Sequence, residues 1–307
     1  MREKILVKFD ENTSLVCYIW KNETAPSIGT IQLSHGMAEH ILRYDELAEY
    51  FVSLGYTVIG HDHYAHGNSA KSIDAIGEVL EYDFMDAILK GMKLVRDYFD
   101  EYFMPSKSYL FAHSMGAMAS LRYIELYSND FDKVILSGPD GFSIKYSFAK
   151  LITGLLNKKD KIVYSNFVLN LSTGSFNKKF KKDHEKYGWL SSNIDNVLKY
   201  ASDPMCGKDF PVNYFNSLAK MMCTTSKNKN LAKINKNIKI YLYSGSLDPV
   251  NNYHKAIKSL YICYKKHNLD VAIKEYINAR HEVHNEIDEI KNILFKDLSN
   301  FLKEEVI

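Results

Sequence analysis

The feature that most constrains the fold is the pentapeptide Ala-His-Ser-Met-Gly at residues 112–116. The apolar run at 108–111 predicts a buried strand before it, and residues 117–127 predict a helix after it. A strand, a sharp turn around a central serine and a helix form the layout of a nucleophile elbow, in which the turn lifts the serine hydroxyl clear of the sheet. Ser114 is therefore a candidate nucleophile, and the alternative is a serine that only caps the following helix.

The elbow departs from the usual G-x-S-x-G pattern at its first position, which is Ala112. Small residues are needed around such a turn because the strand and the helix approach each other closely. Alanine is the next smallest residue after glycine, although it removes some backbone freedom. The departure is mild, and the pattern still favours an elbow.

Predicted strands and helices alternate along most of the chain. Apolar strands that alternate with amphipathic helices indicate an α/β fold, with a mostly parallel sheet covered by helices on both faces. The predicted strands are residues 4–9, 14–20, 29–33, 56–59, 108–111, 133–136, 237–243 and 271–276. The predicted helices are residues 45–54, 83–99, 117–127, 253–263 and 285–302.

The alternation stops between residues 141 and 235, where helical patterns occur without strands. This segment has 16 Lys against 6 Asp and Glu, a charge of +10, so the rest of a chain of net charge +2 carries −8. We expect residues 1–140 and 236–307 to form one sheet domain and residues 141–235 to form a mainly helical cap inserted into it. The lysines are either a solvated surface or a surface that attracts anionic lipid or a substrate phosphate.

Bulk properties narrow the class of protein further. A chain of 307 residues, 46% apolar and 25% charged, can bury one large or two smaller cores, and a net charge of +2 gives no indication of a nucleic-acid partner. Charges near the start argue against a signal peptide, and no apolar run reaches the roughly 18 residues of a membrane span. Four scattered cysteines predict reduced thiols in a cytoplasmic protein. They are Cys17, Cys206, Cys223 and Cys263.

Partners for the serine occur later in the chain. A serine hydroxyl needs a histidine base, and the base needs a carboxylate that fixes its tautomer. In sheets of this kind the three residues occur along the chain in the order serine, acid, histidine, and the acid and the histidine lie on loops that follow later strands. Asp248 follows the strand at 237–243 and His281 follows the strand at 271–276. Their alternative roles are turn chemistry for Asp248 and a capping or surface histidine for His281, and His284 is a competing base nearer the final helix.

An oxyanion hole requires two backbone N–H donors. One is expected from Met115, directly after the serine and at a helix N-terminus. The other is expected from Met37, in the loop Ser-His-Gly-Met-Ala-Glu-His at residues 34–40 that follows an early strand. His35 in this loop is expected to hold the loop through a hydrogen bond and not to act in catalysis.

Residues 60–69 hold a dense group of potential metal ligands. They include His61, Asp62, His63 and His66. A turning loop of this spacing would scatter those side chains, and no second ligand cluster is evident, so we expect a rigid loop rather than a metal site. The expected chemistry requires neither a metal ion nor an organic cofactor.

Several segments together resemble the monoacylglycerol lipase and lysophospholipase branch of the α/β-hydrolase superfamily. They are residues 35–40 (His-Gly-Met-Ala-Glu-His) with Arg43 and Tyr44, residues 62–69, the elbow, residues 203–206 (Asp-Pro-Met-Cys), Ser244 and Gly245 with Asp248, and residues 279–281 (Ala-Arg-His). The resemblance spans almost the whole chain and is weakest between residues 142 and 200. It implies a triad of Ser114, Asp248 and His281, with the Met37 and Met115 amides as the oxyanion hole.

The expected activity is hydrolysis of a carboxylic ester through an acyl-enzyme, with a monoacylglycerol or lysophospholipid as substrate. The alternatives are a short-chain carboxylesterase, an aminopeptidase or amidase on the same fold, and a non-catalytic binding protein. The basic segment is a candidate for transient contact with an anionic membrane, and the oligomeric state is left open. The residues expected either to line an acyl tunnel or to form the cap's own core are Phe142, Ile144, Phe148, Leu151, Leu155, Leu156, Phe167, Val168 and Leu169.

Overall fold

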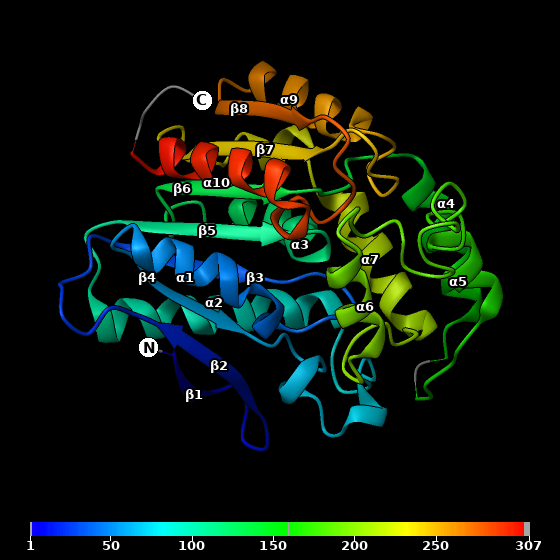
Figure 1. Ribbon diagram of the computed structural model, residues 1–307. Coiled ribbons are helices and arrows are strands. Elements are labelled where there is room, and N and C mark those ends of the chain that lie inside the picture. Colours follow the sequence, from blue (N-terminus) through cyan, green and yellow to red (C-terminus); the bar gives the residue numbers. More distant parts are fainter. Residues whose placement is uncertain (1, 159, 304–307) are drawn as a thin grey trace.

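The computed structural model describes residues 2–158 and 160–303 and contains one eight-stranded sheet of order β1-β2-β4-β3-β5-β6-β7-β8 (Figure 1). The strands are β1 (Arg2–Lys8), β2 (Ser14–Trp20), β3 (Thr30–Ser34), β4 (Thr57–His61), β5 (Ser108–His113), β6 (Lys133–Ser137), β7 (Lys239–Gly245) and β8 (Asp270–Tyr276). β2 is antiparallel to both of its neighbours, and every pair from β4 through β8 is parallel. The mostly parallel sheet predicted from the alternation is confirmed.

Helices cover both faces of the sheet. The α-helices are α1 (Asp45–Ser53), α2 (Phe84–Phe103), α3 (Met115–Leu126), α4 (Lys145–Leu156), α5 (Asn166–Ser172), α6 (Ile194–Ser202), α7 (Val212–Thr224), α8 (Asn228–Leu231), α9 (Lys255–Lys266) and α10 (Asp288–Lys303). The 3-10 helices are η1 (Ile41–Tyr44), η2 (Gly67–Ser69), η3 (Ile73–Ala75) and η4 (Val283–Asn285). α1 and α10 pack on one face, while α2, α3 and α9 pack on the other.

The central strand β5 shows how the sequence builds this core. Successive side chains of a strand point to opposite faces. Leu110 and Ala112 belong to the apolar cluster under α2 and α3, whereas Tyr109 and Phe111 belong to the cluster under α1 and α10. A strand buried on both faces has no polar alternation, and this explains the continuous apolar run in the sequence.

The predicted elements are present with their ends shifted by a few residues. The helix expected from residue 117 begins at Met115, directly after Ser114. The helix expected from residue 285 begins at Asp288, because Glu286 is extended and separates it from η4. Between β6 and β7 the described residues form α4 to α8 and no strand, and α4, α5 and α6 lie beyond the carboxyl ends of the parallel strands (Figure 1).

No helix among the described residues combines the length and the apolar character needed to cross a membrane.

The His-rich segment after β4 is a folded loop held by its aspartate. Asp62 Oδ1 accepts the N–H of Ile41 at 2.8 Å, and Oδ2 accepts the N–H of Asn68 at 2.7 Å. Gly67 has a φ of 45°, and a Cβ there would lie 2.5 Å from the Asp62 carboxyl group. The carboxylate is therefore occupied by backbone donors, in agreement with a rigid loop.

Four buried histidine rings pack against one another, tilted or edge to face, near the ends of β3 and β4. The rings of His35 and His63 are 4.2 Å apart and those of His61 and His63 are 4.7 Å apart. His35 accepts the N–H of His63 at Nε2, 2.9 Å away, and its Nδ1 lies 2.8 Å from the Gly36 carbonyl, so it holds the loop as predicted. Burial lowers the pKa of all four, to about 3 for His61 and about 4 for His66. The folded protein keeps these rings neutral.

We predict that stability falls as the pH is lowered below the ordinary histidine pKa of about 6.5. The unfolded chain then binds protons at His61 and His66, while the folded chain does not until the pH reaches their folded pKa values of about 3 and about 4. Each such histidine contributes up to about 1.4 kcal/mol per pH unit. Thermal unfolding measured from about pH 7.5 to about pH 5 should show a continuous fall in Tm.

A His66→Gln variant should show a shallower fall, since it removes one group that is buried and neutral. The control is Asn237→Gln, which changes an exposed residue without a titratable group and should leave the slope unchanged. A Tm that is constant across this pH range would contradict the prediction.

Candidate active site

Ser114 lies at a strained turn between β5 and α3. Its φ of 53° and ψ of −118° are disfavoured for any residue with a side chain, at a cost of about 1–3 kcal/mol. The turn is held because the Ser114 N–H donates to the Ser137 carbonyl at 2.9 Å and the Met118 N–H donates to the Ser114 carbonyl at 2.9 Å. The predicted elbow geometry is present at this position.

Close packing around the turn explains its small residues. A Cβ on Gly116 would lie 2.5 Å from the carbonyl oxygens of both Ser34 and His35, so only glycine fits there. Ala112 is fully buried near the carboxyl end of β5, in register with Ser34 and Leu136. The alanine methyl group therefore packs in the core and leaves the turn intact.

The structure brings the three distant side chains together. The Ser114 hydroxyl lies 2.8 Å from His281 Nε2, and His281 Nδ1 lies 2.9 Å from Asp248 Oδ2. With the proton on Nδ1, the imidazole donates to the carboxylate and accepts from the hydroxyl. Asp248 is itself fixed by the Val250 N–H at 2.9 Å and by Asn251 Nδ2 at 2.6 Å. This row of groups is the arrangement that a base-assisted nucleophile requires.

Electrostatics distinguish the two candidate bases. Burial lowers the pKa of His281, but the charge and hydrogen bond of Asp248 outweigh it, so the pKa is raised above its usual value. Burial lowers the pKa of His284 to about 3, and its ring stacks on Tyr44 with centroids 5.0 Å apart. His284 therefore supports the packing of the site, whereas His281 is placed to accept a proton.

The loop after β3 approaches the serine closely enough to supply an oxyanion donor. A Cβ on Gly36 would lie 3.2 Å from Ser114 Cβ. The next residue, Met37, lines the same cavity as Met115 and Ser114. Ala38, which follows, has a φ of 58°, and this left-handed conformation turns the loop. The two residues whose amides are expected to bind an oxyanion therefore line the same cavity as the hydroxyl.

Gly138, after β6, was not recognised as a site residue from the sequence. Its φ is 58°, and a Cβ would lie 3.1 Å from Asp248 Oδ2 and 3.2 Å from His281 Nδ1. A side chain at this position would therefore press on both the acid and the base. A glycine directly after a predicted strand is the signal that could have identified it.

The site opens into a cavity of about 560 Å³, within the range of roughly 300–1,000 Å³ that is typical of small-molecule sites. Most of its wall is apolar and comes from α3, α4, α5 and α7. Apolar wall residues include Met118, Ile152, Val168, Leu171, Phe215 and Leu218.

The predicted tunnel residues are largely corrected by the structure. Of the nine named from the sequence, Phe148 and Val168 line the cavity. Leu169 packs half-buried against the core. The others are exposed, and they are Phe142, Ile144, Leu151, Leu155, Leu156 and Phe167. The error has a physical reason: α4 is apolar on two sides, and the side that lines the cavity carries Phe148, Ala149 and Ile152, whereas Leu151, Leu155 and Leu156 lie outside it.

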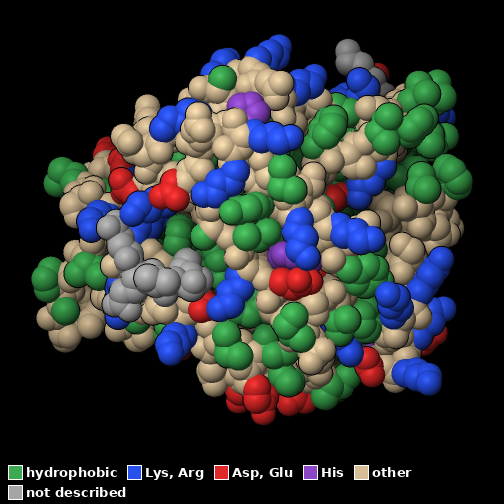
Figure 2. All heavy atoms as spheres, turned by 90° about the horizontal axis from the view of Figure 1, so that it is seen from above, with side chains coloured by type: hydrophobic (Ala, Val, Ile, Leu, Met, Phe, Trp, Pro, Cys, Tyr) green, Lys and Arg blue, Asp and Glu red, His purple; other side chains and the backbone are tan. Residues whose placement is uncertain are grey.

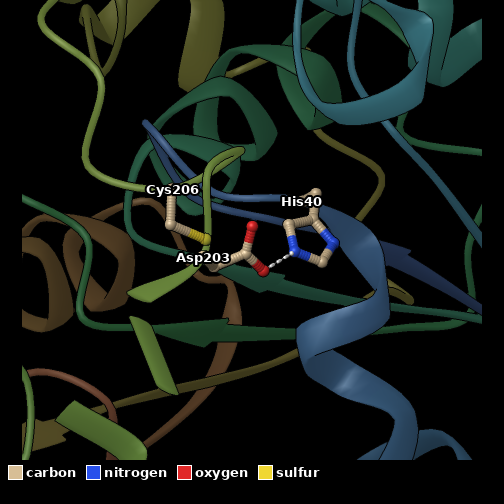
Figure 3. A group of neighbouring side chains, drawn as sticks. All are labelled: His40, Asp203 and Cys206. Atoms are coloured by element: carbon tan, nitrogen blue, oxygen red, sulfur yellow. Dashed lines mark hydrogen bonds and ion pairs between the residues drawn. The ribbon is translucent and has the colours of Figure 1, made fainter. Parts of the chain in front are cut away.

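A second group of potential metal ligands lies where the loop after β3 meets the end of α6. His40 Nε2 is 2.8 Å from Asp203 Oδ2, with Cys206 beside them (Figure 3). Burial raises the pKa of the Cys206 thiol, and the neighbouring Arg43 guanidinium disfavours a further cation there. We interpret the group as a tether between the loop and the helical segment.

The fold and the site together define a serine hydrolase of the α/β-hydrolase class. More particularly, the chain matches the family described as "Serine aminopeptidase, S33" over residues 25–288, and it belongs to that family.

Curated relatives match almost the whole chain. The monoglyceride lipase homolog of Monkeypox virus is 28% identical over 298 residues, which cover 95% of each protein. The monoglyceride lipase of Rattus norvegicus is 26% identical over 302 residues, 95% of this chain and 88% of the relative.

Solved structures show the same fold. A carboxyl esterase from Bacillus coagulans in complex with glycerol has a TM-score of 0.89 at 21% identity, covering 100% of this chain and 99% of that one. A monoglyceride lipase from Saccharomyces cerevisiae in complex with a substrate analog has a TM-score of 0.76 at 18% identity, covering 99% and 96%.

We predict that Gly138→Ala lowers kcat/KM at least about tenfold while the protein remains folded. The added methyl group must displace either the imidazole or the carboxylate, and an alanine at positive φ adds about 1 kcal/mol of strain. The control is Gly154→Ala on α4, where a Cβ would meet Asn216 Nδ2 at an ordinary 3.6 Å. Equal kinetics of the two variants would show that the close contact at Gly138 does not matter.

Proposed function

We propose that this chain is a serine ester hydrolase that cleaves monoacylglycerols or lysophospholipids through an acyl-enzyme. The observation that carries the proposal is the hydrogen-bonded row of Ser114, His281 and Asp248 at the mouth of an apolar cavity. The lipase names of the relatives that match nearly the full chain support the choice of substrate.

In the proposed mechanism, Ser114 Oγ attacks the ester carbonyl while His281 takes its proton. Asp248 holds the imidazole in the correct tautomer and stabilises its charged form. The Met37 and Met115 amides bind the oxyanion, and each donor of this kind is typically worth about 10²–10³ in rate. The protonated His281 then gives its proton to the leaving alcohol, and water removes the acyl group by the same steps.

The carboxylates in the cavity wall favour an ester over an aminopeptidase substrate. An aminopeptidase needs a carboxylate free to bind the substrate amine. Among the described residues, three carboxylates line the cavity: Glu39 and Glu282 pair with Arg43, and Asp140 pairs with Lys145. Each already contacts a cation, so none is free to bind a substrate amine, and an apolar acyl chain fits the space better. Aminopeptidase activity is the second candidate function because the family description carries that name.

We predict that the purified protein hydrolyses long-chain glycerol monoesters or lysophospholipids faster than short nitrophenyl esters or aminoacyl amides. Ser114→Ala should lower the rate by roughly 10⁴-fold or more with an unchanged melting curve. The measurement is a hydrolysis panel of these four substrate types with both proteins. Undiminished ester hydrolysis by Ser114→Ala, or a preference for amides, would contradict the proposal.

We further propose that residues 141–235 act as a cap between core segments 1–140 and 236–307, and that the protein is cytoplasmic. Tethers from α6 to the oxyanion loop support the cap. Tyr200 donates its hydroxyl hydrogen to the Ala38 carbonyl at 2.9 Å, and the Gly207 N–H donates to the same oxygen at 2.8 Å. The four cysteines are free thiols, as expected in a reducing compartment.

The outer side of α4 and α5 supports transient contact with an anionic membrane. Ile144, Phe148, Leu151 and Leu155 follow helical spacing on α4 and its start, and each is more than half exposed. Phe167 and Leu171 continue this surface on α5. Figure 2 shows hydrophobic side chains gathered on the right of the view, with Lys and Arg side chains on the neighbouring surface. Exposed apolar residues next to basic side chains suit an interface of anionic lipid.

We predict that the protein sediments with vesicles of phosphatidylcholine mixed with phosphatidylglycerol, and that a Leu151→Glu, Leu155→Glu double variant does so at least about tenfold less. Removing two inserted leucines loses roughly 1.5–3 kcal/mol each. Ile262→Glu, an exposed apolar residue on α9, is the matched control and should bind like the original. Equal sedimentation of all three proteins would contradict membrane contact through this surface.

A further inference from the structure

A buried cluster of three charges lies beside the proposed triad. Arg43 Nη1 and Nη2 donate to the two carboxylate oxygens of Glu282 at 2.8 and 2.7 Å, and Arg43 also donates to Glu39 Oε2. The three side chains are only 8%, 2% and 3% exposed. Burying an ion costs several kcal/mol unless it is closely paired, and the bidentate contact meets that requirement.

The cluster joins the two loops that carry the proposed chemistry. Glu282 directly follows the proposed base His281. Glu39 Oε1 accepts the Gly36 N–H at 2.6 Å, and Gly36 directly precedes Met37, the proposed oxyanion donor. The base loop and the oxyanion loop are far apart in the chain, and Arg43 pairs with a carboxylate of each.

Residues of α6 close the cluster from the side of the helical segment. Asn196 Oδ1 accepts from Arg43 Nη2 at 3.2 Å, and Asn196 Nδ2 donates to Glu282 Oε2 at 2.8 Å. The guanidinium of Arg43 lies 4.7 Å from the centre of the Tyr200 ring. The charges are therefore shielded from water, which strengthens the pairing.

We propose that Glu39, Arg43 and Glu282 form a positioning lock that sets the distance between the proposed base and the proposed oxyanion amide. The inference rests on the proposed function, because it assigns these residues a role in the same site. They are positioning residues: Glu282 acts through His281, and Glu39 acts through the Gly36 amide. Arg43 fixes both loops at once, so a change at one carboxylate is transmitted to the other loop.

The lock also has an electrostatic effect on the base, and this effect separates it from a merely structural contact. Burial lowers the pKa of His281, while Asp248, Glu282 and Glu39 raise it. The titratable side chains that face His281 are Asp248, Glu282, Glu39, His113 and His284. Although burial raises the pKa of Glu282, the charge and hydrogen bonds of Arg43 lower it to about 2, so this carboxylate stays ionised at neutral pH.

The test measures the rate of fluorophosphonate labelling and the pH profile of kcat/KM on a short nitrophenyl ester. We expect Glu282→Gln to lower kcat at least about tenfold with KM changed less than about twofold, since about 1.4 kcal/mol of the barrier corresponds to tenfold. The acidic limb of the profile should move to lower pH, because His281 loses a charge that favours its protonated form. Glu282→Asp keeps the charge and should retain the original limb.

The matched control is Glu125→Gln at the far end of α3. Glu125 is also a buried carboxylate, paired with Arg122 at 2.8 Å and bonded to the Ser226 N–H at 2.6 Å. The Glu125→Gln substitution should lower the melting temperature without moving the acidic limb of the pH profile. Arg43→Lys, which retains the charge but loses the bidentate contact, should lower kcat and leave the limb nearly in place.

The outcomes separate the two proposals. If the unmodified protein is not labelled by the fluorophosphonate, the proposed function fails. If it is labelled, but Glu282→Gln is labelled equally fast and keeps both kcat and the acidic limb, only the lock is refuted. A lower kcat without any shift of the limb, matched by Glu125→Gln, would reduce Glu282 to a structural residue and also refute the lock.

Discussion

The strained backbone at Ser114 is the constraint on which the rest of the site depends. A φ of 53° points the hydroxyl away from the sheet, and the turn is kept because Gly116 packs directly on the carbonyls of Ser34 and His35. That packing places the loop after β3 against the start of α3. The same contact therefore presents the proposed nucleophile and brings the residues of the proposed oxyanion amides close to it. The surrounding parallel strands stabilise the strained backbone of Ser114.

The sequence predicted the elements that local patterns encode. β5 is a continuous apolar run because it is buried on both faces, and α3 follows at once because small residues permit close packing. The loops holding Asp248 and His281 were found because chain order along a parallel sheet fixes which strand ends meet. The resemblance to known lipases added the substrate class, which the residues alone did not determine.

The parts that were missed depend on tertiary contacts. Leu151 and Leu155 were expected either to line a tunnel or to form the cap's own core, but both are exposed, because helical spacing cannot tell which of two apolar sides of α4 faces the cavity. Gly138 and Glu282 were passed over for a similar reason. Neither lies in a motif of its own, and each matters only because folding brings it next to His281 or Arg43. Such contacts join distant parts of the chain, and Glu282 is 239 positions from Arg43.

The proposed mechanism requires that Ser114 be activated for covalent chemistry. This requirement is tested by locating, with peptide mass spectrometry, the residue modified when the protein is inactivated by a long-chain fluorophosphonate. We expect one adduct per chain, on Ser114, with loss of ester hydrolysis in proportion to its formation. An adduct on another residue, or full inactivation with Ser114 unmodified, would contradict it.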